Sequence, residues 1–119
     1  VRNKSFLTFL VLAENKIVGY CFMRSFVNGT SYRGYVVDSG WRGKGIAKIM
    51  GIGMNSVGMT LRLKMYKSIS PENVASMMAT KSVCETKVLR TLKNGDYLME
   101  CKAKKTDRLN NCWIVENKN

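Results

Sequence analysis

The sequence predicts an α+β fold, in which a mixed, mostly antiparallel sheet of about six strands packs with two helices. Three observations lead to this prediction. Residues 5–37 contain three strand-like segments joined by short turns, as in an antiparallel meander. Residues 46–58 and 70–81 have helical signals on either side of another strand-like segment. Residues 86–101 have the pattern of a closing hairpin, and the whole chain, residues 1–119, is expected to form a single domain.

The first three strands are predicted from their side chains. Residues 5–14 and 17–26 are rich in aliphatic and aromatic residues, which favour buried strands, and a short polar turn separates them. Asn28 and Gly29 form a strong turn signal, and residues 31–37 after it are the third predicted strand.

A helix is predicted to begin at Ile46, because apolar residues then recur at spacings of three and four. Gly51, Gly53 and Gly58 lower its intrinsic stability by roughly 1 kcal/mol each relative to alanine. Small residues can also let a helix lie close to a sheet. The end of this helix near Gly58 is expected to be weak.

The next strand is predicted at residues 61–66, which alternate apolar and basic side chains. The second helix is predicted to start at Ser70, with Pro71 in its first turn and Asn73 at the third position, and to end near Lys81. Further along, two strands are predicted at residues 86–92 and 97–101, with a turn signal at residues 93–96 between them. A short extra strand or a docked tail is predicted at residues 112–115.

Composition excludes several kinds of protein. The 119 residues are 45% hydrophobic and 24% charged, which is the balance of a globular domain. The chain has no histidine and its four cysteines form no CxxC pair, so we expect no metal site and mostly buried, reduced thiols. No apolar run approaches the ~20 residues that span a bilayer, and no secretory signal is recognisable. We therefore expect a cytoplasmic protein with no membrane partner.

The net charge is strongly positive, at +12 from 20 Lys and Arg against 8 Asp and Glu. Such a field attracts nucleic acid, anionic membranes or a phosphate-rich ligand. The basic residues are spread along the chain, however, and a solvated surface explains most of them. Charge alone therefore does not select a partner.

Residues 35–47 combine a strand end, a glycine-bearing turn and a helix start. The N–H groups and the dipole at a helix start favour anions, and Gly43 and Gly45 would let the backbone approach a phosphate closely. Three basic side chains add positive charge at the turn: Arg42, Lys44 and Lys48. This segment is the strongest candidate for a ligand site in the chain.

Two common phosphate motifs do not fit the turn. A Walker A loop would need glycine where Asp38 stands, and a dinucleotide GxGxxG would need glycine where Lys48 stands. The segment Arg42-Gly43-Lys44-Gly45-Ile46-Ala47 does resemble the coenzyme-binding motif of GNAT N-acetyltransferases, Arg/Gln-x-x-Gly-x-Gly/Ala, and matches it at every defined position.

The rest of the chain supports this resemblance from about residue 6 to residue 102. The order of elements is similar to the GNAT fold from its second strand to its last, Asn73-x-x-Ser76 looks like the family's second motif, and residues 94–100 look like its closing hairpin. The strand and two helices that usually come first in the family are lacking, and the sequence begins at Val1. This pattern indicates that the chain is a natural short form or a fragment, or that a partner, such as a second copy in a homodimer, supplies the acceptor side of the site.

The resemblance implies a site for acetyl-CoA as the acyl donor. The coenzyme's pyrophosphate would bind the backbone of the turn formed by Arg42, Gly43, Lys44, Gly45, Ile46 and Ala47. Val37, on a strand splayed by a bulge, would offer backbone groups to the pantetheine arm, and Asn73 would hydrogen-bond the same arm. The alternatives are a core strand residue for Val37 and an ordinary helix-start residue for Asn73.

The sequence contains only weak candidates for catalysis. The family's second motif usually continues to a Tyr that protonates the departing thiolate, and Thr80 stands at that position here. Residues 31–37 contain no acid that could act as a base. Tyr66 and Thr80 are the candidates for the acid, with structural packing as the alternative for both. Cys84 has no histidine in the chain to activate it as a nucleophile.

Two functions follow as hypotheses. The first is an N-acetyltransferase that transfers an acetyl or similar acyl group from acetyl-CoA directly to an amine of a small-molecule or peptide acceptor. The second is a non-catalytic basic binding module with a GNAT-like shell, which binds nucleic acid or an acidic partner. The net charge favours the module, whereas the intact turn and the lack of an aromatic-and-basic RNA motif favour the enzyme and disfavour nucleic acid.

Overall fold

The computed structural model of the protein describes residues 6–24 and 28–104. Its elements, in chain order, are β1 (Phe6–Ala13), β2 (Lys16–Arg24), β3 (Thr30–Val37), a 3-10 helix (Ser39–Trp41), α1 (Ile46–Thr60), β4 (Lys64–Ile69), α2 (Val74–Val83), β5 (Cys84–Thr91) and β6 (Tyr97–Ala103). The six strands form one sheet in the order β1-β2-β3-β4-β6-β5. This architecture confirms the predicted α+β fold and its mostly antiparallel sheet.

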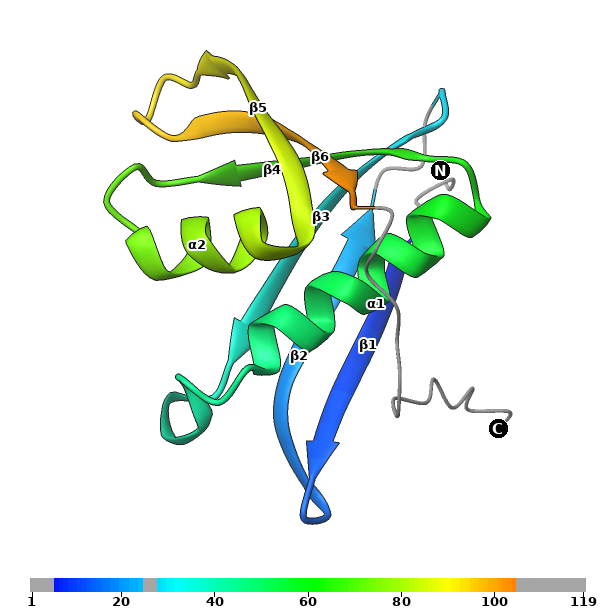
Figure 1. The fold of residues 1–119 in the computed structure, drawn as a ribbon, viewed down its shortest axis with the longest axis vertical. Coiled ribbons are helices and arrows are strands. Elements are labelled where there is room, and N and C mark those ends of the chain that lie inside the picture. Colours follow the sequence, from blue (N-terminus) through cyan, green and yellow to red (C-terminus); the bar gives the residue numbers. More distant parts are fainter. Residues whose placement is uncertain (1–5, 25–27, 105–119) are drawn as a thin grey trace.

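One pair of strands in the sheet is parallel. β3 and β4 run in the same direction, whereas the other neighbouring strands are antiparallel. Parallel strands need a crossover, and α1 supplies it. Figure 1 shows α1 and α2 on the same face of the sheet, with α1 across β2 and β3 and α2 beside β4 and β5.

The fourth strand lies further along the chain than predicted. It runs from Lys64 to Ile69 rather than over residues 61–66. The amide N–H groups of Leu61 and Leu63 donate to carbonyl oxygens in the last turn of α1, at 2.9 and 2.8 Å. These residues therefore close the helix, and the alternating pattern of their side chains does not mark a strand start.

The second helix begins at Val74, one turn after the predicted start. Asn73 is its N-cap, since Asn73 Oδ1 accepts a hydrogen bond from the amide of Ser76 at 3.2 Å. Ser70, the predicted cap, instead accepts from the amide of Glu72 at 3.3 Å in the preceding turn. The fifth strand, Cys84–Thr91, is displaced toward the N-terminus relative to the predicted 86–92, and the sixth, Tyr97–Ala103, extends beyond the predicted 97–101. The segment predicted at residues 112–115 lies outside the described residues.

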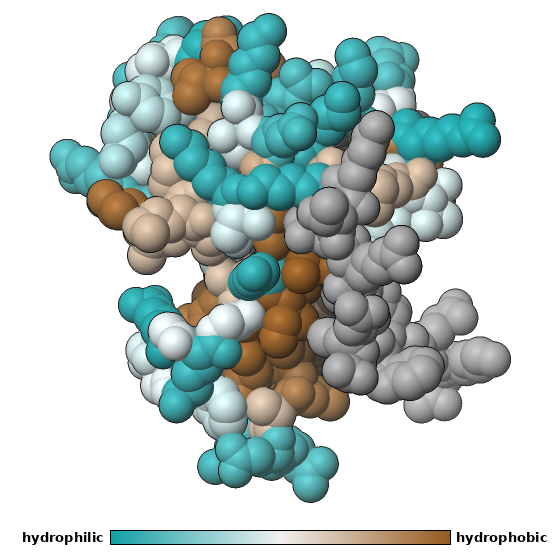
Figure 2. All heavy atoms as spheres, in the orientation of Figure 1, coloured by the Kyte–Doolittle hydropathy of each residue, from teal (hydrophilic) through white to brown (hydrophobic). Residues whose placement is uncertain are grey.

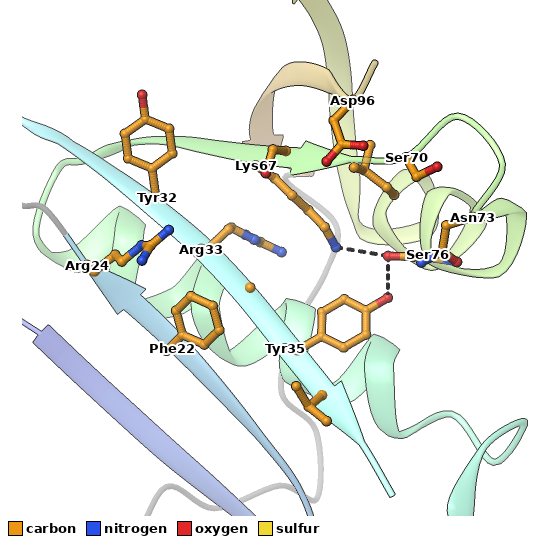
Figure 3. A pocket seen from close by; sticks show the side chains of 14 residues that line it. Phe22, Arg24, Tyr32, Arg33, Tyr35, Lys67, Ser70, Asn73, Ser76 and Asp96 are labelled. Carbon is orange, nitrogen blue, oxygen red and sulfur yellow. Dashed lines mark hydrogen bonds between the residues drawn. The ribbon is translucent and has the colours of Figure 1, made fainter. Parts of the chain in front are cut away.

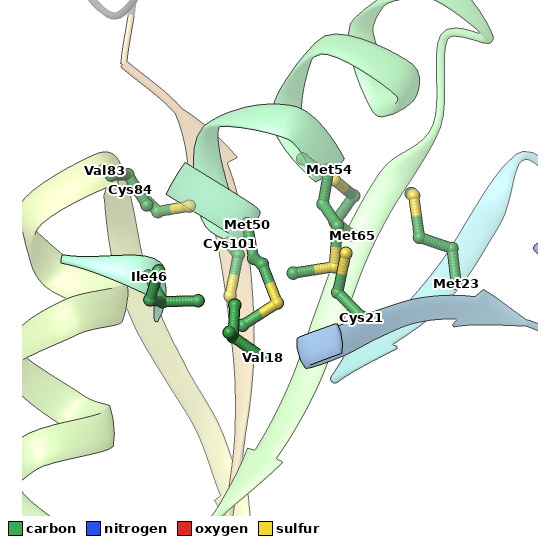
Figure 4. Packing of buried hydrophobic residues seen from close by; sticks show 10 residues of the cluster. All are labelled: Val18, Cys21, Met23, Ile46, Met50, Met54, Met65, Val83, Cys84 and Cys101. Carbon is green, nitrogen blue, oxygen red and sulfur yellow. The ribbon is translucent and has the colours of Figure 1, made fainter. Parts of the chain in front are cut away.

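The core between the sheet and α1 is rich in sulphur. It contains the side chains of Val18, Cys21, Met23, Ile46, Met50, Met54, Met65, Val83, Cys84 and Cys101. Figure 4 shows them converging from β2, β4 and β6 and from both helices. The three described cysteines are buried and form no disulfide, as the sequence predicts, and Cys112 lies outside the described residues.

Two of the three glycines in α1 allow the predicted close packing. A Cβ added at Gly51 would lie 2.8 Å from Val83 Cγ2, and one added at Gly58 would lie 2.5 Å from Met65 Sδ. A Cβ at Gly53 would meet no atom within 4 Å. Gly51 and Gly58 therefore set the distance between α1 and its neighbours, whereas Gly53 only weakens the helix.

Candidate active site

The candidate site is a pocket where β3 and β4 separate. These strands pair only from Thr30 to Tyr32, opposite Lys64 to Tyr66, and then diverge. The pocket in the resulting wedge has a volume of about 350 Å³, and α2 contributes to its wall. Figure 3 shows its lining side chains, which come from β2, β3, β4, the start of α2 and the β5–β6 turn: Phe22, Arg24, Tyr32, Arg33, Tyr35, Lys67, Ser70, Asn73, Ser76 and Asp96.

Val37 lies at the end of β3 and packs against the core. The predicted splay is present, but the predicted bulge is not, because β2 and β3 pair from Gly19–Val37 to Arg24–Tyr32 without a register shift. Beyond Tyr32 the edge of β3 that faces β4 has no partner strand among the described residues. The backbone there is open to an extended ligand, which is the situation that strand-like recognition of an amide chain requires.

The glycine turn before α1 has an unusual backbone. Gly43 and Gly45 have φ angles of +76° and +82°, and a Cβ at either position would meet no atom within 4 Å. Residues with a side chain rarely adopt these angles, so glycine is needed for the conformation rather than for space. The 3-10 helix that precedes the turn is capped by Asp38, whose Oδ2 accepts from the amide of Gly40 at 3.2 Å.

The N-terminus of α1 fits an anion. Its N-cap is Gly45, so no side chain caps the first turn, and no acidic residue stands in that turn. The unpaired N–H groups of a first turn attract negative charge. Ile46 is buried and Ala47 is half-buried, whereas the other residues of the turn are exposed: Arg42, Gly43, Lys44 and Gly45.

The turn and the pocket are separate features that β3 connects. None of the residues that line the pocket belongs to the turn, but β3 leads from one to the other. In Figure 2 the surface is indented between α2 and the turn before α1. A ligand with an anionic middle and an extended arm could therefore contact both.

Asn73 is the predicted ligand residue that lines the pocket. Its Oδ1 caps α2 by accepting from Ser76, so the helix-start role is present. The Nδ2 group has no hydrogen-bond partner in the described ranges. Asn73 can thus cap the helix with its oxygen and offer its amide N–H groups to a ligand at the same time.

Lys67 occupies the inner wall of the pocket. Only 7% of this residue is exposed, and its Nζ donates to Ser76 Oγ and to Thr80 Oγ1, both at 3.2 Å. Nζ also lies 4.2 Å from the centre of the Tyr35 ring, and the Tyr35 hydroxyl donates to Ser76 Oγ at 2.9 Å. Figure 3 shows this network spanning from β3 to α2. Hydroxyl groups and a ring face thus surround a buried ammonium.

Burial, together with the nearby charge of Arg33, lowers the pKa of Lys67 from 10.5 to about 8. Arg33 is itself only 5% exposed, and its guanidinium bonds to Asn55 Oδ1 rather than to a carboxylate. No carboxylate pairs with either cation in the part of the chain that the structure describes. The inner wall of the pocket is therefore positive and suited to an anionic group.

The two catalytic candidates lie in different places. Thr80 is buried behind the pocket and accepts the hydrogen bond from Lys67. Tyr66 is next to Lys67 in sequence, so its side chain leaves the opposite face of the strand. Its ring lies 5.9 Å from that of Tyr32. The structure thus joins Thr80 to the polar network and leaves Tyr66 outside it.

Sequence reasoning missed Lys67, and a signal for it was present. In a strand, residues at alternate positions share a face, so Lys67 had to lie with Met65 and Ile69. Both of those neighbours are buried, which places the ammonium inside as well. The predicted strand, residues 61–66, ends before Lys67, so the alternation of Met65, Lys67 and Ile69 is not apparent from it. The sequence marks Asp96, the acidic residue among the lining side chains, only as part of a turn.

The described residues contain no group of three or more side chains suited to hold a metal ion. Within the same ranges, no helix is long and apolar enough to cross a membrane.

No protein-family model matches the sequence, and no curated protein matches it. The fold does match solved structures. The aminoglycoside acetyltransferase AAC(6')-Ib, in complex with coenzyme A and kanamycin, has a TM-score of 0.70 at 12% identity, over 85% of this chain and 68% of that one. RimJ from Mycobacterium smegmatis, in complex with CoA-disulfide, has a TM-score of 0.70 at 21% identity, over 82% of this chain and 53% of that one.

An acetyltransferase of the GNAT family from Streptococcus pneumoniae has a TM-score of 0.64 at 13% identity, over 82% of this chain and 67% of that one. The chain therefore has the fold of the GNAT acetyltransferases. It spans about half the length of RimJ and about two thirds of the other two. At these identities the likeness shows the fold alone.

Proposed function

We propose that this chain binds acetyl-CoA and transfers its acetyl or a similar acyl group directly to an amine. The observation that carries the proposal is the position of two features along β3: a wedge open to an extended arm, and a glycine turn open to an anion. Coenzyme A has both an amide-bearing arm and a pyrophosphate. Solved structures with the same fold that hold coenzyme A or CoA-disulfide support this proposal.

The coenzyme would be held mainly by backbone. Its pyrophosphate would accept hydrogen bonds from the N–H groups of the turn from Arg42 to Ala47, with Lys44 beside it. The pantetheine arm would lie along the unpaired edge of β3 up to Val37, where its amides can replace the missing strand partner. Asn73 would donate to the arm from the start of α2.

Direct transfer requires the amine and the thioester to meet in the wedge. Holding two reactants together contributes most of the acceleration in such a reaction, and protons can leave through water. Asp96 lines the pocket from the β5–β6 turn, where its carboxylate would attract a protonated amine. A small-molecule or peptide amine fits this geometry, and a solved structure of the same fold is an aminoglycoside acetyltransferase.

Calorimetric titration with acetyl-CoA tests the proposal. The parent protein is compared with Gly45→Val, in which the side chain would strain the turn and block its N–H groups. Gly29→Val is the matched control, because Gly29 also has a positive φ, at +72°, with no atom within 4 Å of an added Cβ. Both variants carry similar backbone strain, but Gly29 lies at the opposite end of β3.

Binding that is lost in Gly45→Val and retained in Gly29→Val supports the coenzyme site. Equal loss in both variants means that backbone strain, and not a blocked site, explains the result, and contradicts the proposed position. No binding by the folded parent protein contradicts the acetyltransferase and favours the basic binding module.

A further inference from the structure

A buried ammonium with no carboxylate partner among residues 6–24 and 28–104 is the feature of the pocket that the acetyl-CoA proposal leaves unexplained. Lys67 lines the pocket, yet within the described residues its Nζ contacts only the hydroxyls of Ser76 and Thr80 and the ring of Tyr35. Burying a charge without a counter-charge is costly, and a packed apolar residue would be more stable there. A charged side chain that is retained in a pocket despite this loss of stability is a candidate catalytic group.

We propose that the ammonium of Lys67 is the acid that protonates the departing sulphur of coenzyme A. This inference rests on the proposed acetyl-CoA site and names a catalytic residue within it. Lys67 belongs to β4, one wall of the wedge, and Figure 3 shows its side chain reaching across the wedge toward Ser76. A thioester lying between β3 and β4 would place its sulphur beside Nζ.

The hydroxyl groups fix the ammonium without neutralising it. Ser76 and Thr80 are both on α2, one turn apart, and accept two of its three N–H groups. The Tyr35 hydroxyl donates to Ser76, which orients the oxygen of Ser76 toward Nζ. A carboxylate in their place would hold the proton more tightly. Ser76, Thr80 and Tyr35 are thus positioning residues for Lys67.

The proton balance of the step is complete. The amine nitrogen forms a bond to the thioester carbonyl carbon, the carbon–sulphur bond breaks, and its electron pair goes to sulphur. Sulphur takes a proton from Nζ and leaves as a thiol. The amine gives up one proton to solvent, and neutral Lys67 regains one from solvent. No oxidant, metal or covalent intermediate is needed.

The acidity of Lys67 suits this transfer. Burial lowers its pKa to about 8, close to the pKa of about 8.5 for an ordinary thiol, so the proton moves between groups of similar acidity. The groups that act on its charge are Arg33 of β3, Cys84 of β5 and Cys101 of β6. Arg33 opposes the ammonium and is always charged, so it also favours a nearby thiolate.

The test compares coenzyme A with desulfo-coenzyme A, which lacks the sulphur, and needs no acceptor. Affinities are measured by calorimetry for the parent protein, for Lys67→Met, and for Lys64→Met as the control, since Lys64 is an exposed lysine of the same strand. The parent and Lys64→Met are expected to prefer coenzyme A by about tenfold at pH 8, the effect of one charge-assisted hydrogen bond. Lys67→Met is expected to lose this preference while binding the desulfo analogue as the parent does.

Retention of the preference in Lys67→Met, or its absence in the parent, overturns the role of Lys67 while leaving the coenzyme site standing. Failure of the parent to bind either ligand overturns the proposed function itself. If Lys67→Met binds neither ligand, the pKa of the bound thiol, followed by the ultraviolet absorbance of the thiolate, is compared between the parent and Lys67→Gln, which retains Arg33. A thiol pKa that is lower in the parent supports the proposal, and equal values overturn it.

Discussion

Asn55 Oδ1 lies 2.6 Å from Nη1 of Arg33, so a side chain of α1 holds the buried guanidinium of β3. The same amide group donates from Nδ2 to the carbonyl oxygen of Val83 at 3.0 Å. Asn55 and Arg33 are 1% and 5% exposed. One amide side chain thus joins a strand, the crossover helix and the end of α2 behind the pocket.

Replacing Asn55 by leucine is expected to destabilise the protein strongly. The substitution leaves a buried cation and a buried carbonyl group without this partner, and the free energy of unfolding should fall by about 3 kcal/mol. Urea denaturation measures the change, with Ser56→Ala on the same helix as the control. A loss below about 1 kcal/mol for Asn55→Leu would show that Arg33 is stabilised by other groups.

The glycines of α1 should respond in opposite ways to substitution by alanine. Gly53→Ala is expected to raise the free energy of unfolding by about 0.5–1 kcal/mol, because the site is open and alanine favours a helix. Gly51→Ala is expected to lower it, because the new Cβ would lie 2.8 Å from the stiff side chain of Val83. Thermal unfolding of the two variants measures the contrast, and stabilisation by both would mean that α1 is not held close to α2.

The stability of the protein should depend on Lys67 at alkaline pH. The pKa of Lys67 is lowered to about 8 in the folded state by burial and by Arg33, whereas the unfolded chain has an ordinary lysine pKa of about 10.4. Between these values the unfolded state binds more protons, so the contribution of Lys67 to stability rises with pH. The rise amounts to about 3 kcal/mol from pH 7 to pH 10.5.

The core thiols act in the opposite direction over the same range. Burial raises the pKa of Cys21 to about 11, so the unfolded state loses this proton first and stability falls as pH increases above about 9. The pKa of Cys101 is raised too, by its hydrogen bond with Cys84 and by burial. The quantity to measure is therefore the difference between the free energies of unfolding of the parent protein and Lys67→Met as a function of pH. The contributions of the thiols largely cancel in this difference. A difference that does not change with pH would contradict a buried ammonium.

The fold was predictable because its signals are local. The runs of aliphatic and aromatic residues in β1 and β2 and the Asn28–Gly29 turn were sufficient for the meander. The errors occurred where tertiary contacts override local pattern. Residues 61–63 alternate like a strand but close α1, and Ser70 could have capped a helix that Asn73 begins instead.

The candidate site was predictable only in part. The glycine turn has a sequence signature, since positive φ angles and exposed N–H groups require particular residues at fixed spacings. The pocket has none, because it arises where β3 and β4 separate, and Lys67 meets Thr80 and Tyr35 only after α2 packs across the sheet. Contacts between residues so far apart in sequence depend on the complete fold.

The sulphur-rich core gives the protein a specific sensitivity to oxidation. Met23, Met50, Met54 and Met99 are almost completely enclosed, so the native packing shields their sulphur atoms from peroxide. A methionine that is oxidised while the chain is open becomes a polar sulfoxide, which such an interior cannot accept. Each unfolding event under oxidising conditions would then be harder to reverse. The protein's lifetime should depend on how often it opens as well as on how stable it is.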